Sequence, residues 1–378
     1  MIGSIFPVRQ HFGRYPKPGG ALDFCPATAT GGPIQRLKWW LLGIAVAGLL
    51  AWFLHAQLAN RSFDWRLLAG TLRLLRWQWL ALALVPIFAS YYGRALRWSV
   101  FLRPLKPKPS VVNILGATVI GFTAITLFGR PGEFVRPYLI ARKEQVPIPS
   151  QLAAWVLERM FDLLMALAVF GFALTRIHPG AVPLGPNLTW VLAMGGRIVG
   201  MLSGSVLVLL VVMRHFADPV QRWTLRVLRI LPERYFRKLE DLITTFVQGI
   251  QSTRSDGALL LILLYSVAEW ILIAGCFWCV AQAYGNMINI TFVDVLVIMG
   301  FVAFGSTVQI PGIGGGAQVV AILVLTELYG AKLELATSFA VLLWIMSFVV
   351  IVPVGLTWGL SEGLNWRKLR QLGQEAAQ

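Results

Sequence analysis

Long apolar stretches recur along the whole chain and indicate its class. Each has about the 20 residues that a helix needs to cross a hydrocarbon core of about 30 Å. Because a chain in lipid must satisfy its own backbone hydrogen bonds, such stretches are expected to be helical. The pattern predicts an all-α polytopic membrane protein with about six full transmembrane helices, at residues 39–58, 77–96, 150–174, 189–213, 258–282 and 335–359.

Two further apolar segments, 111–128 and 291–310, run into breaks rich in Pro and Gly, at Pro131-Gly132 and at Pro311-Gly312 with Gly314 and Gly315. Residues 108 and 149 are both expected on the cytoplasmic side of the membrane, and 134–143 is too short to cross. The first segment must therefore enter and return on the same side, as a re-entrant helical hairpin.

The second break lies 180 residues after the first, and its segment is expected to start outside. The two segments therefore predict a pair of re-entrant hairpins in an inverted repeat, the arrangement that places a transporter's site near the midplane. Two alternatives stay open: a chance agreement of two breaks, and full crossing by the second pair.

Charge orients these segments. The net charge is +16, yet only 13% of residues are charged, 57% are hydrophobic and the mean hydropathy is +0.69. The basic residues lie in short loops between apolar stretches, as the positive-inside rule predicts, so nucleic acid is not an expected partner. We expect a bacterial-type inner (cytoplasmic) membrane with both termini cytoplasmic.

The predicted organisation has three parts: a disordered cytoplasmic tail over 1–35, a transmembrane domain over 36–365 and a cytoplasmic tail over 366–378. Within the domain, apolar residues of 214–256 recur at helical spacing among arginines, which predicts amphipathic helices on the cytoplasmic face. The basic segment 61–76 falls on the outside in this topology, and its role stays open.

Neither a metal nor a cofactor is expected. Cys276 and Cys279 form a CxxC inside an apolar stretch, where packing is a better explanation than redox chemistry. The four histidines have no metal-ligand spacing. No catalytic domain is recognisable, so we do not expect an enzyme.

Charged residues inside apolar segments mark the candidate site, because a charge at the bilayer centre costs about 2.5–3.5 kcal/mol. Around the first break, both Arg130 and Arg136 lie three residues from Glu133, which predicts a self-neutralising cluster. A structural alternative is that these residues hold the hairpin tip.

The helix from Ser150 adds Glu158, Arg159 and Asp162. Its two carboxylates share one face and could carry a proton unless an arginine lies between them. The alternative is an Arg159–Asp162 packing bridge.

Secondary candidates are Arg197 and Glu269, predicted to form a structural ion pair. Arg94 and Arg97 lie at the predicted inner boundary, where we expect them to reach out to lipid phosphates. Unpaired backbone N–H groups at the breaks favour anions. Together with Arg130, Arg136 and Arg159, they predict a pocket for a phosphate-bearing headgroup.

The motifs Gly129-Arg130-Pro131-Gly132-Glu133-Phe134-Val135-Arg136, Glu158-Arg159-Met160-Phe161-Asp162 and Pro311-Gly312-Ile313-Gly314-Gly315 resemble the flippase-like family called the lysylphosphatidylglycerol synthase transmembrane region. The resemblance covers about residues 36–365 and implies lipid translocation. Two departures matter: Gln318 stands where the family usually has Glu, and Ile313 replaces a glycine.

The predicted function is therefore a flippase or transporter for an anionic or aminoacylated phospholipid, or for a polyprenyl-phosphate-linked lipid. Two alternatives are kept. One is a membrane anchor or partner subunit of a separate lipid-modifying enzyme, and the other is a membrane glycosyl or aminoacyl transferase. The sequence leaves the oligomeric state open.

Overall fold

The computed structural model describes residues 63–176, 186–215, 217–229, 233–250, 255–306, 309–310 and 314–363. The predicted span 39–58 and both predicted tails lie outside these residues. From Asp64 onward the chain forms one unit. Its first half contains α2 (Trp65–Leu74), α3 (Trp77–Leu102), α4 (Val111–Phe128), the 3-10 turn η1 (Arg130–Phe134), α5 (Val135–Glu144), α6 (Ile148–Arg176), α7 (Pro186–His215), α8 (Ala217–Leu228) and α9 (Glu233–Ile250).

The second half contains α10 (Asp256–Tyr284), the 3-10 turn η3 (Gly285–Met287), α11 (Phe292–Gly305), the two-residue strands β1 (Gln309–Ile310) and β2 (Gly314–Gly315), α12 (Gly316–Glu327), α13 (Leu333–Trp344), the π-helical turn η4 (Ile345–Val349) and α14 (Ile351–Ser361). Apart from the short antiparallel pairing of β1 with β2, the regular structure of the described residues is helical. This confirms the predicted helical membrane class.

Four described helices are long and apolar enough to cross a membrane: Trp77–Leu102, Val111–Phe128, Asp256–Met287 and Leu333–Ser361. They include the predicted spans 77–96, 258–282 and 335–359. The predicted spans 150–174 and 189–213 lie within α6 and α7, which have 29 and 30 residues, and α6 carries Glu158, Arg159 and Asp162 along its length.

Both interrupted segments turn back on themselves. Gly129 ends α4 with a φ of 72°, which favours glycine, and α5 then runs back along α4. The contact is close, because a Cβ at Gly121 would lie 2.6 Å from Cβ of Arg136. The second segment closes in the same way, since a Cβ at Gly305 would lie 2.6 Å from the carbonyl oxygen of Gly316.

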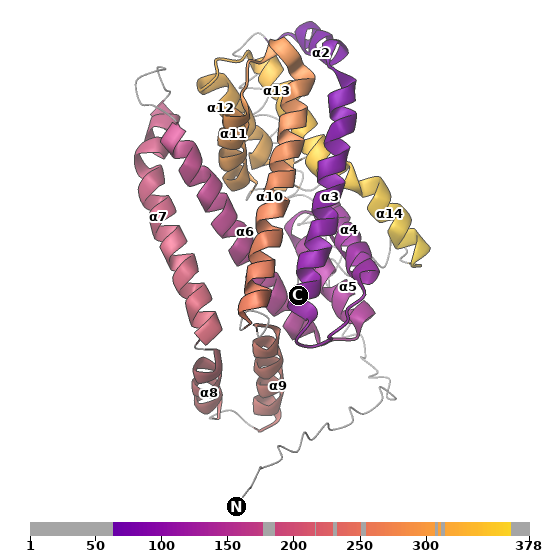
Figure 1. Ribbon diagram of the computed structural model, residues 1–378, viewed down its shortest axis with the longest axis vertical. Coiled ribbons are helices and arrows are strands. Elements are labelled where there is room, and N and C mark those ends of the chain that lie inside the picture. The colour runs from indigo at the N-terminus through magenta and orange to yellow at the C-terminus, as the bar shows by residue number, and fades with distance from the viewer. Residues whose placement is uncertain are drawn as a thin grey trace, which may run out of the picture. The chain divides into compact units, whose positions relative to one another are not determined.

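Besides α6 with α9, three long-range helix pairs contribute to the core: α3 with α10, α4 with α14, and α6 with α11. A glycine lies at each of these three contacts: Gly275 of α10 faces Pro86 of α3, Gly355 of α14 faces Thr123 of α4, and Gly300 of α11 faces Phe170 of α6. Small residues let helix backbones approach closely in membranes. In Figure 1, α4 and α5 lie toward the end of the unit near α9, whereas α11 and α12 lie toward the end near α2.

The amphipathic segments are helical where they are described. Asp64 caps α2 by accepting the N–H of Arg66 at 2.8 Å, and its own N–H donates to Glu334 at 3.1 Å, which ties α2 to α13. Within 214–256, α8 and α9 form as expected. A Cβ at Gly249 would lie 2.4 Å from the carbonyl oxygen of Ser150, so α9 packs tightly on α6.

Candidate functional site

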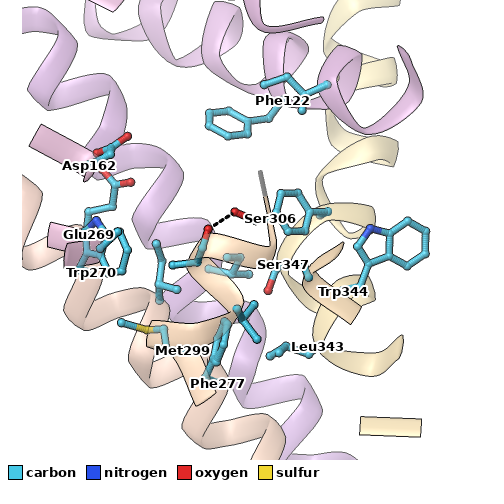
Figure 2. Close-up of a pocket in the computed structure, with 18 of the residues that line it drawn as sticks. Phe122, Asp162, Glu269, Trp270, Phe277, Met299, Ser306, Leu343, Trp344 and Ser347 are labelled. Carbon is cyan, nitrogen blue, oxygen red and sulfur yellow. Dashed lines mark hydrogen bonds between the residues drawn. The ribbon is translucent and has the colours of Figure 1, made fainter. Parts of the chain in front are cut away.

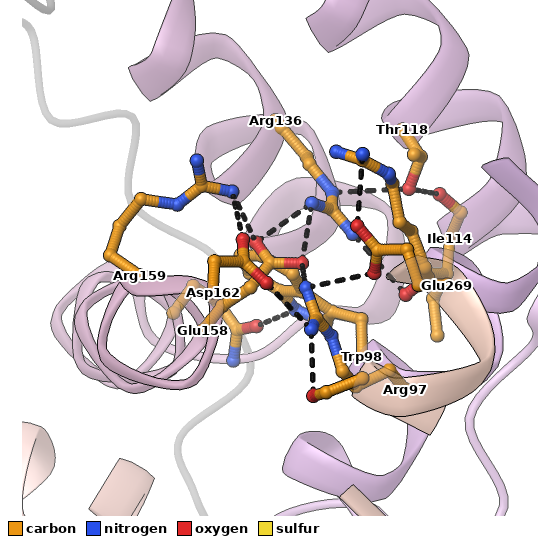
Figure 3. A network of polar contacts seen from close by, with 12 residues as sticks. Arg97, Trp98, Ile114, Thr118, Arg136, Glu158, Arg159, Asp162 and Glu269 are labelled. Atoms are coloured by element: carbon orange, nitrogen blue, oxygen red, sulfur yellow. Dashed lines mark hydrogen bonds and ion pairs between the residues drawn. The ribbon is translucent and has the colours of Figure 1, made fainter. Parts of the chain in front are cut away.

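Charged side chains from α3, α5, α6 and α10 meet inside the helical unit (Figure 3). Arg97 lies at the centre, with a fully buried side chain. Its Nη2 lies 2.8 Å from Oε1 of Glu158, and its Nη1 lies 2.8 Å from Oδ1 of Asp162 and 2.9 Å from Oγ of Ser266. The prediction that Arg97 reaches lipid phosphates is therefore wrong. Because α3 is covered by α6 and α10 at this point, Arg97 faces their carboxylates instead.

Arg136, in the first turn of α5, binds the other side of Glu158. Its Nη1 lies 2.9 and 2.8 Å from the two carboxylate oxygens, and its Nε donates to Oγ1 of Thr118 at 3.1 Å. Its guanidinium carbon lies 4.2 Å from the centre of the Trp98 ring, a cation–π distance. Arg136 is thus held by Glu158, Thr118 and Trp98 and is a fixed part of the network.

The hairpin tip differs from the predicted cluster. Glu133 pairs with Arg130 at 2.6 Å, but Arg136 turns away to Glu158 and is not its partner. The reason is packing, because α5 lies against α4 beside α6, where Arg136 meets Thr118 and Glu158. Arg130 also donates from Nη2 to the carbonyl oxygen of Ser306 at 3.4 Å, so the tip of the first hairpin meets the end of α11.

Glu269 of α10 faces α3. Its Oε1 lies 2.9 Å from Nη2 of Arg94, and its Oε2 lies 3.2 Å from Nη2 of Arg97. The predicted partner, Arg197, has a side chain outside the described residues, and the observed partners are these two arginines. Arg94 was expected at the lipid boundary, but its guanidinium carbon lies over the Phe122 ring at 4.5 Å. The packing of α3 along α10 produces this pairing.

Arg159 extends from α6 toward the cavity described below. Its Nη2 lies 3.0 Å from Oδ2 of Asp162 and 3.4 Å from Oε2 of Glu158. Its side chain is 38% exposed, far more than those of Arg97 and Arg136. The predicted Arg159–Asp162 bridge is thus observed, and Arg97 lies between the carboxylates of Glu158 and Asp162.

Among the described side chains, the network is short of negative charge. Four arginines, Arg94, Arg97, Arg136 and Arg159, face three carboxylates, those of Glu158, Asp162 and Glu269, which leaves one net positive charge. A buried network with an uncompensated positive charge favours an anionic ligand.

The network borders a cavity of about 370 Å³ (Figure 2). Its charged lining consists of Arg94, Arg130, Glu133, Arg159, Asp162 and Glu269. Figure 2 shows Asp162 and Glu269 on one side of the cavity and Leu343 and Trp344 on the other. Much of the remaining lining is aromatic or aliphatic, and includes Phe122, Trp270, Phe277, Met299 and Phe348. Oγ of Ser347, in the π-helical turn, also lies here without a hydrogen-bond partner.

The residues of the helix breaks have different positions. Pro131 and Gly132 lie in η1, where a Cβ at Gly132 would lie 2.4 Å from the carbonyl carbon of Ala124. Pro311 and Gly312 lie outside the described residues, while Gly314 and Gly315 form β2. Gln318 lines the cavity, and its Oε1 accepts the N–H of Gly315 at 2.6 Å. A side-chain amide is sufficient for this contact.

Sequence reasoning missed the central role of α3. The spacing of Arg94 and Arg97, three residues apart, was the available signal, because it places both on one face of a helix. The contacts of Ser266 and Thr118 could not be predicted, because a single hydroxyl residue in an apolar helix does not indicate a polar partner. Cys276 and Cys279 are buried and unbridged, in keeping with a packing role. The described residues contain no group of three His, Cys, Asp or Glu side chains that could hold a metal.

Comparison with known proteins gives the family. Residues 40–355 match the sequence model of the lysylphosphatidylglycerol synthase TM region. A curated protein named "Glycosyltransferase AglD", from Haloferax volcanii, is 30% identical over 149 residues, which cover 37% of this chain and 24% of that protein. This chain therefore matches about a quarter of that relative's length.

No solved structure matches the chain. The family match extends over most of the sequence and includes all the charged residues of the network. With its apolar helices, the chain is a multi-pass membrane protein that belongs to the lysylphosphatidylglycerol synthase TM region family.

Proposed function

We propose that the protein is a lipid flippase or transporter. Its substrate is an anionic or aminoacylated phospholipid, or a polyprenyl-phosphate-linked lipid, moved across a bacterial-type inner membrane with both termini of the protein cytoplasmic. The observation that carries this proposal is the cavity, where charged groups face an apolar lining of aliphatic and aromatic side chains. A lipid has the same division into a charged headgroup and apolar chains.

The headgroup contacts follow from exposure. Arg159 and Arg130 have side chains that are 38% and 49% exposed, so they can bind a phosphate without dismantling the network. Arg136 is saturated by Glu158, Thr118 and Trp98, so we assign it to support of the site. Asp162 and Glu133 would contact a cationic part of the headgroup where one is present.

The helix pairing supports an inverted repeat. In such a repeat, α3, α4, α5 and α6 would correspond to α10, α11, α12 and the α13–α14 helix. The α3–α10 pair then joins two equivalent helices, and the α4–α14 pair is equivalent to the α11–α6 pair. The two hairpins would then be re-entrant gates at opposite ends, in contact through Arg130 and Ser306. Inverted repeats with broken helices commonly support alternating access.

The test is lipid translocation in proteoliposomes. Labelled phosphatidylglycerol, lysyl-phosphatidylglycerol and a polyprenyl phosphate would be compared for wild type, Arg159→Gln and Glu133→Gln. Arg142→Gln is the matched control, because Arg142 is exposed at the end of α5 and does not line the cavity. We expect wild type and the control to translocate at least one lipid, and Arg159→Gln to lose most of this activity.

Two results would contradict the proposal: no translocation of any of the three lipids by folded wild type, or wild-type rates in Arg159→Gln. Phosphatidylcholine serves as the neutral-headgroup control in the same vesicles. Preference among the three phosphate-bearing lipids would identify the substrate class.

A second candidate is a membrane partner of a lipid-modifying enzyme. The similarity to a quarter of a protein named a glycosyltransferase favours this alternative. Recovery of a stoichiometric enzyme with the purified protein, together with full function of Arg159→Gln in that complex, would support the partner role over transport.

A further inference from the structure

Arg94 and Arg136 each contact a single carboxylate, but Arg136 binds both oxygens of Glu158 and Arg94 only one oxygen of Glu269. The only described carboxylate partner of Arg94 is Glu269, at 2.9 Å, whereas Arg97 contacts Glu158, Asp162 and Glu269. Nε of Arg94 is buried without a hydrogen-bond acceptor, and its side chain is 14% exposed and lines the cavity. Arg94 is therefore free to accept a new anionic partner from the cavity.

Glu269 depends on Arg94 more than the other carboxylates do. Glu158 keeps Arg97 and Arg136, and Asp162 keeps Arg97 and Arg159, when Arg94 turns away. Glu269 would keep only the longer 3.2 Å contact with Arg97, whose charge is shared among three carboxylates. Its side chain is 1% exposed, so hydration compensates poorly for the lost arginine.

We propose that an anionic headgroup and a proton bind together at Arg94 and Glu269. A phosphate oxygen of the headgroup replaces Glu269 as the partner of Arg94. A proton from water then forms an O–H bond on the Glu269 carboxylate, which becomes neutral. One negative charge and one proton enter together, so the charge of the buried network is unchanged.

This inference rests on the proposed function and extends it, because it names a coupling ion and the group that carries it. The charged and titratable side chains that face Glu269 come from α3 and α6 in the described part of the chain: Tyr91, Arg94, Arg97, Glu158 and Asp162. Both α6 carboxylates retain two arginines, so the site of protonation is Glu269. An uncompensated buried charge in this position is strongly unfavourable, which is what couples the two binding events.

The experiment measures binding to the full chain in nanodiscs of phosphatidylcholine over a pH series. The probe is a short-chain phosphatidylglycerol, and glycerol phosphate and short-chain phosphatidylcholine are tested in parallel. Linkage of one proton to one anion predicts that affinity for phosphatidylglycerol falls about tenfold per pH unit above the pH at which Glu269 loses its proton. A neutral headgroup should show no such slope.

Glu269→Gln carries a permanently neutral side chain at this position. We expect it to bind phosphatidylglycerol at the wild-type acid-limit affinity and without the pH slope. Glu133→Gln is the matched control, because it makes the same change in a carboxylate of the same cavity that pairs with Arg130. This control should keep the slope, whatever its affinity.

A second measurement needs no variant. Addition of phosphatidylglycerol to wild type in weakly buffered solution should take up about one proton per bound lipid, followed with a pH-indicator dye. A flat pH profile or no proton uptake overturns the coupling and leaves lipid transport in place. Absence of phosphatidylglycerol binding at every pH overturns the coupling and excludes this lipid as the substrate, whereas the proposed function is decided by the translocation assay with all three lipids. If the affinity for glycerol phosphate also falls with rising pH, this supports replacement of Glu269 at Arg94 by the headgroup phosphate.

Discussion

At the scale of single residues, Arg97 shows how the unit holds charge in an apolar interior. Its guanidinium donates to side chains from α6 and α10 and has no exposed surface. Removing one partner of a buried ion pair costs much more free energy than removing one partner of a surface pair. Arg97 therefore fixes the relative positions of α3, α6 and α10 around the cavity.

We expect Arg97→Gln to lower the free energy of unfolding by about 3–5 kcal/mol, because three carboxylates lose their shared cation. Arg97→Lys should recover only part of this loss, since an ammonium lacks the planar fork of donors. Arg103→Gln, at the exposed C-terminal end of α3, is the control and should have little effect. Equal unfolding temperatures in detergent for the two glutamine variants would contradict this role.

Glu144 gives a residue-scale prediction for pH. Burial by itself would raise the pKa of this carboxyl, but hydrogen bonds from Lys106, Asn113 and the N–H of Ser110 hold the pKa below its usual range. A lowered pKa means that the stabilisation is complete above the ordinary glutamate value of about 4.3 and is lost as pH falls through the lowered pKa.

Glu144→Gln should therefore lower the free energy of unfolding by about 1 kcal/mol at neutral pH. The difference from wild type should shrink as the pH falls below the ordinary glutamate value of about 4.3 and through the lowered pKa, because the wild-type carboxyl then becomes neutral as well. Unfolding temperatures measured over a pH series check this. A difference that grows on acidification would have the wrong sign.

At the scale of elements, the α4–η1–α5 hairpin positions two of the site's arginines. Arg130 lies on the turn and faces the cavity, while Arg136 lies on α5 and faces Glu158. Gly121 sets the distance between the helices, because the backbone of Arg136 lies directly against it. The same close contact brings Thr118 to Nε of Arg136.

Gly121→Ala should accordingly push α5 away from α4 and lower the free energy of unfolding by about 1–3 kcal/mol. Gly93→Ala in α3 is the matched control, because a Cβ there would meet nothing within 4 Å. We expect the control to be neutral or slightly stabilising, since alanine favours helix over glycine. Similar losses in both variants would mean that helix propensity, not packing, decides. The rate of lipid translocation by Gly121→Ala reports whether Arg130 and Arg136 keep their positions in the site.

At the scale of the whole described unit, the hairpins lie toward opposite ends of a core built from paired helices (Figure 1). The first hairpin starts and finishes at one end, since Lys106 pairs with Glu144 at 2.7 Å. The second does the same, since Tyr329 donates to Asp294 at 3.2 Å. The cavity lies between them, lined by residues from both.

Sidedness of labelling tests this arrangement in intact membranes. In a chain with Cys25, Cys276 and Cys279 replaced by serine, a membrane-impermeant maleimide should label Lys108→Cys and Arg142→Cys from one side. Lys332→Cys, at the N-cap of α13, should react only from the other side. Labelling of Lys108→Cys and Arg142→Cys from opposite sides would rule out a re-entrant first hairpin.

The sequence by itself determined the features that depend on neighbouring residues. Runs of apolar residues of membrane-spanning length predicted α3, α10 and α13–α14, and the Pro-Gly breaks predicted where α4 ends. Charge in apolar surroundings identified Glu158, Arg159 and Asp162 because the cost of burying a charge is a local property of its segment.

Only the tertiary structure decided which charges meet. Glu269 pairs with Arg94 because α3 lies along α10, and Arg136 leaves Glu133 for Glu158 because α5 packs on α4 beside α6. These choices depend on glycine contacts between helices far apart in the chain, such as Gly275 against Pro86. Spacing within a helix fixes which residues share a face, whereas helix packing fixes what that face meets.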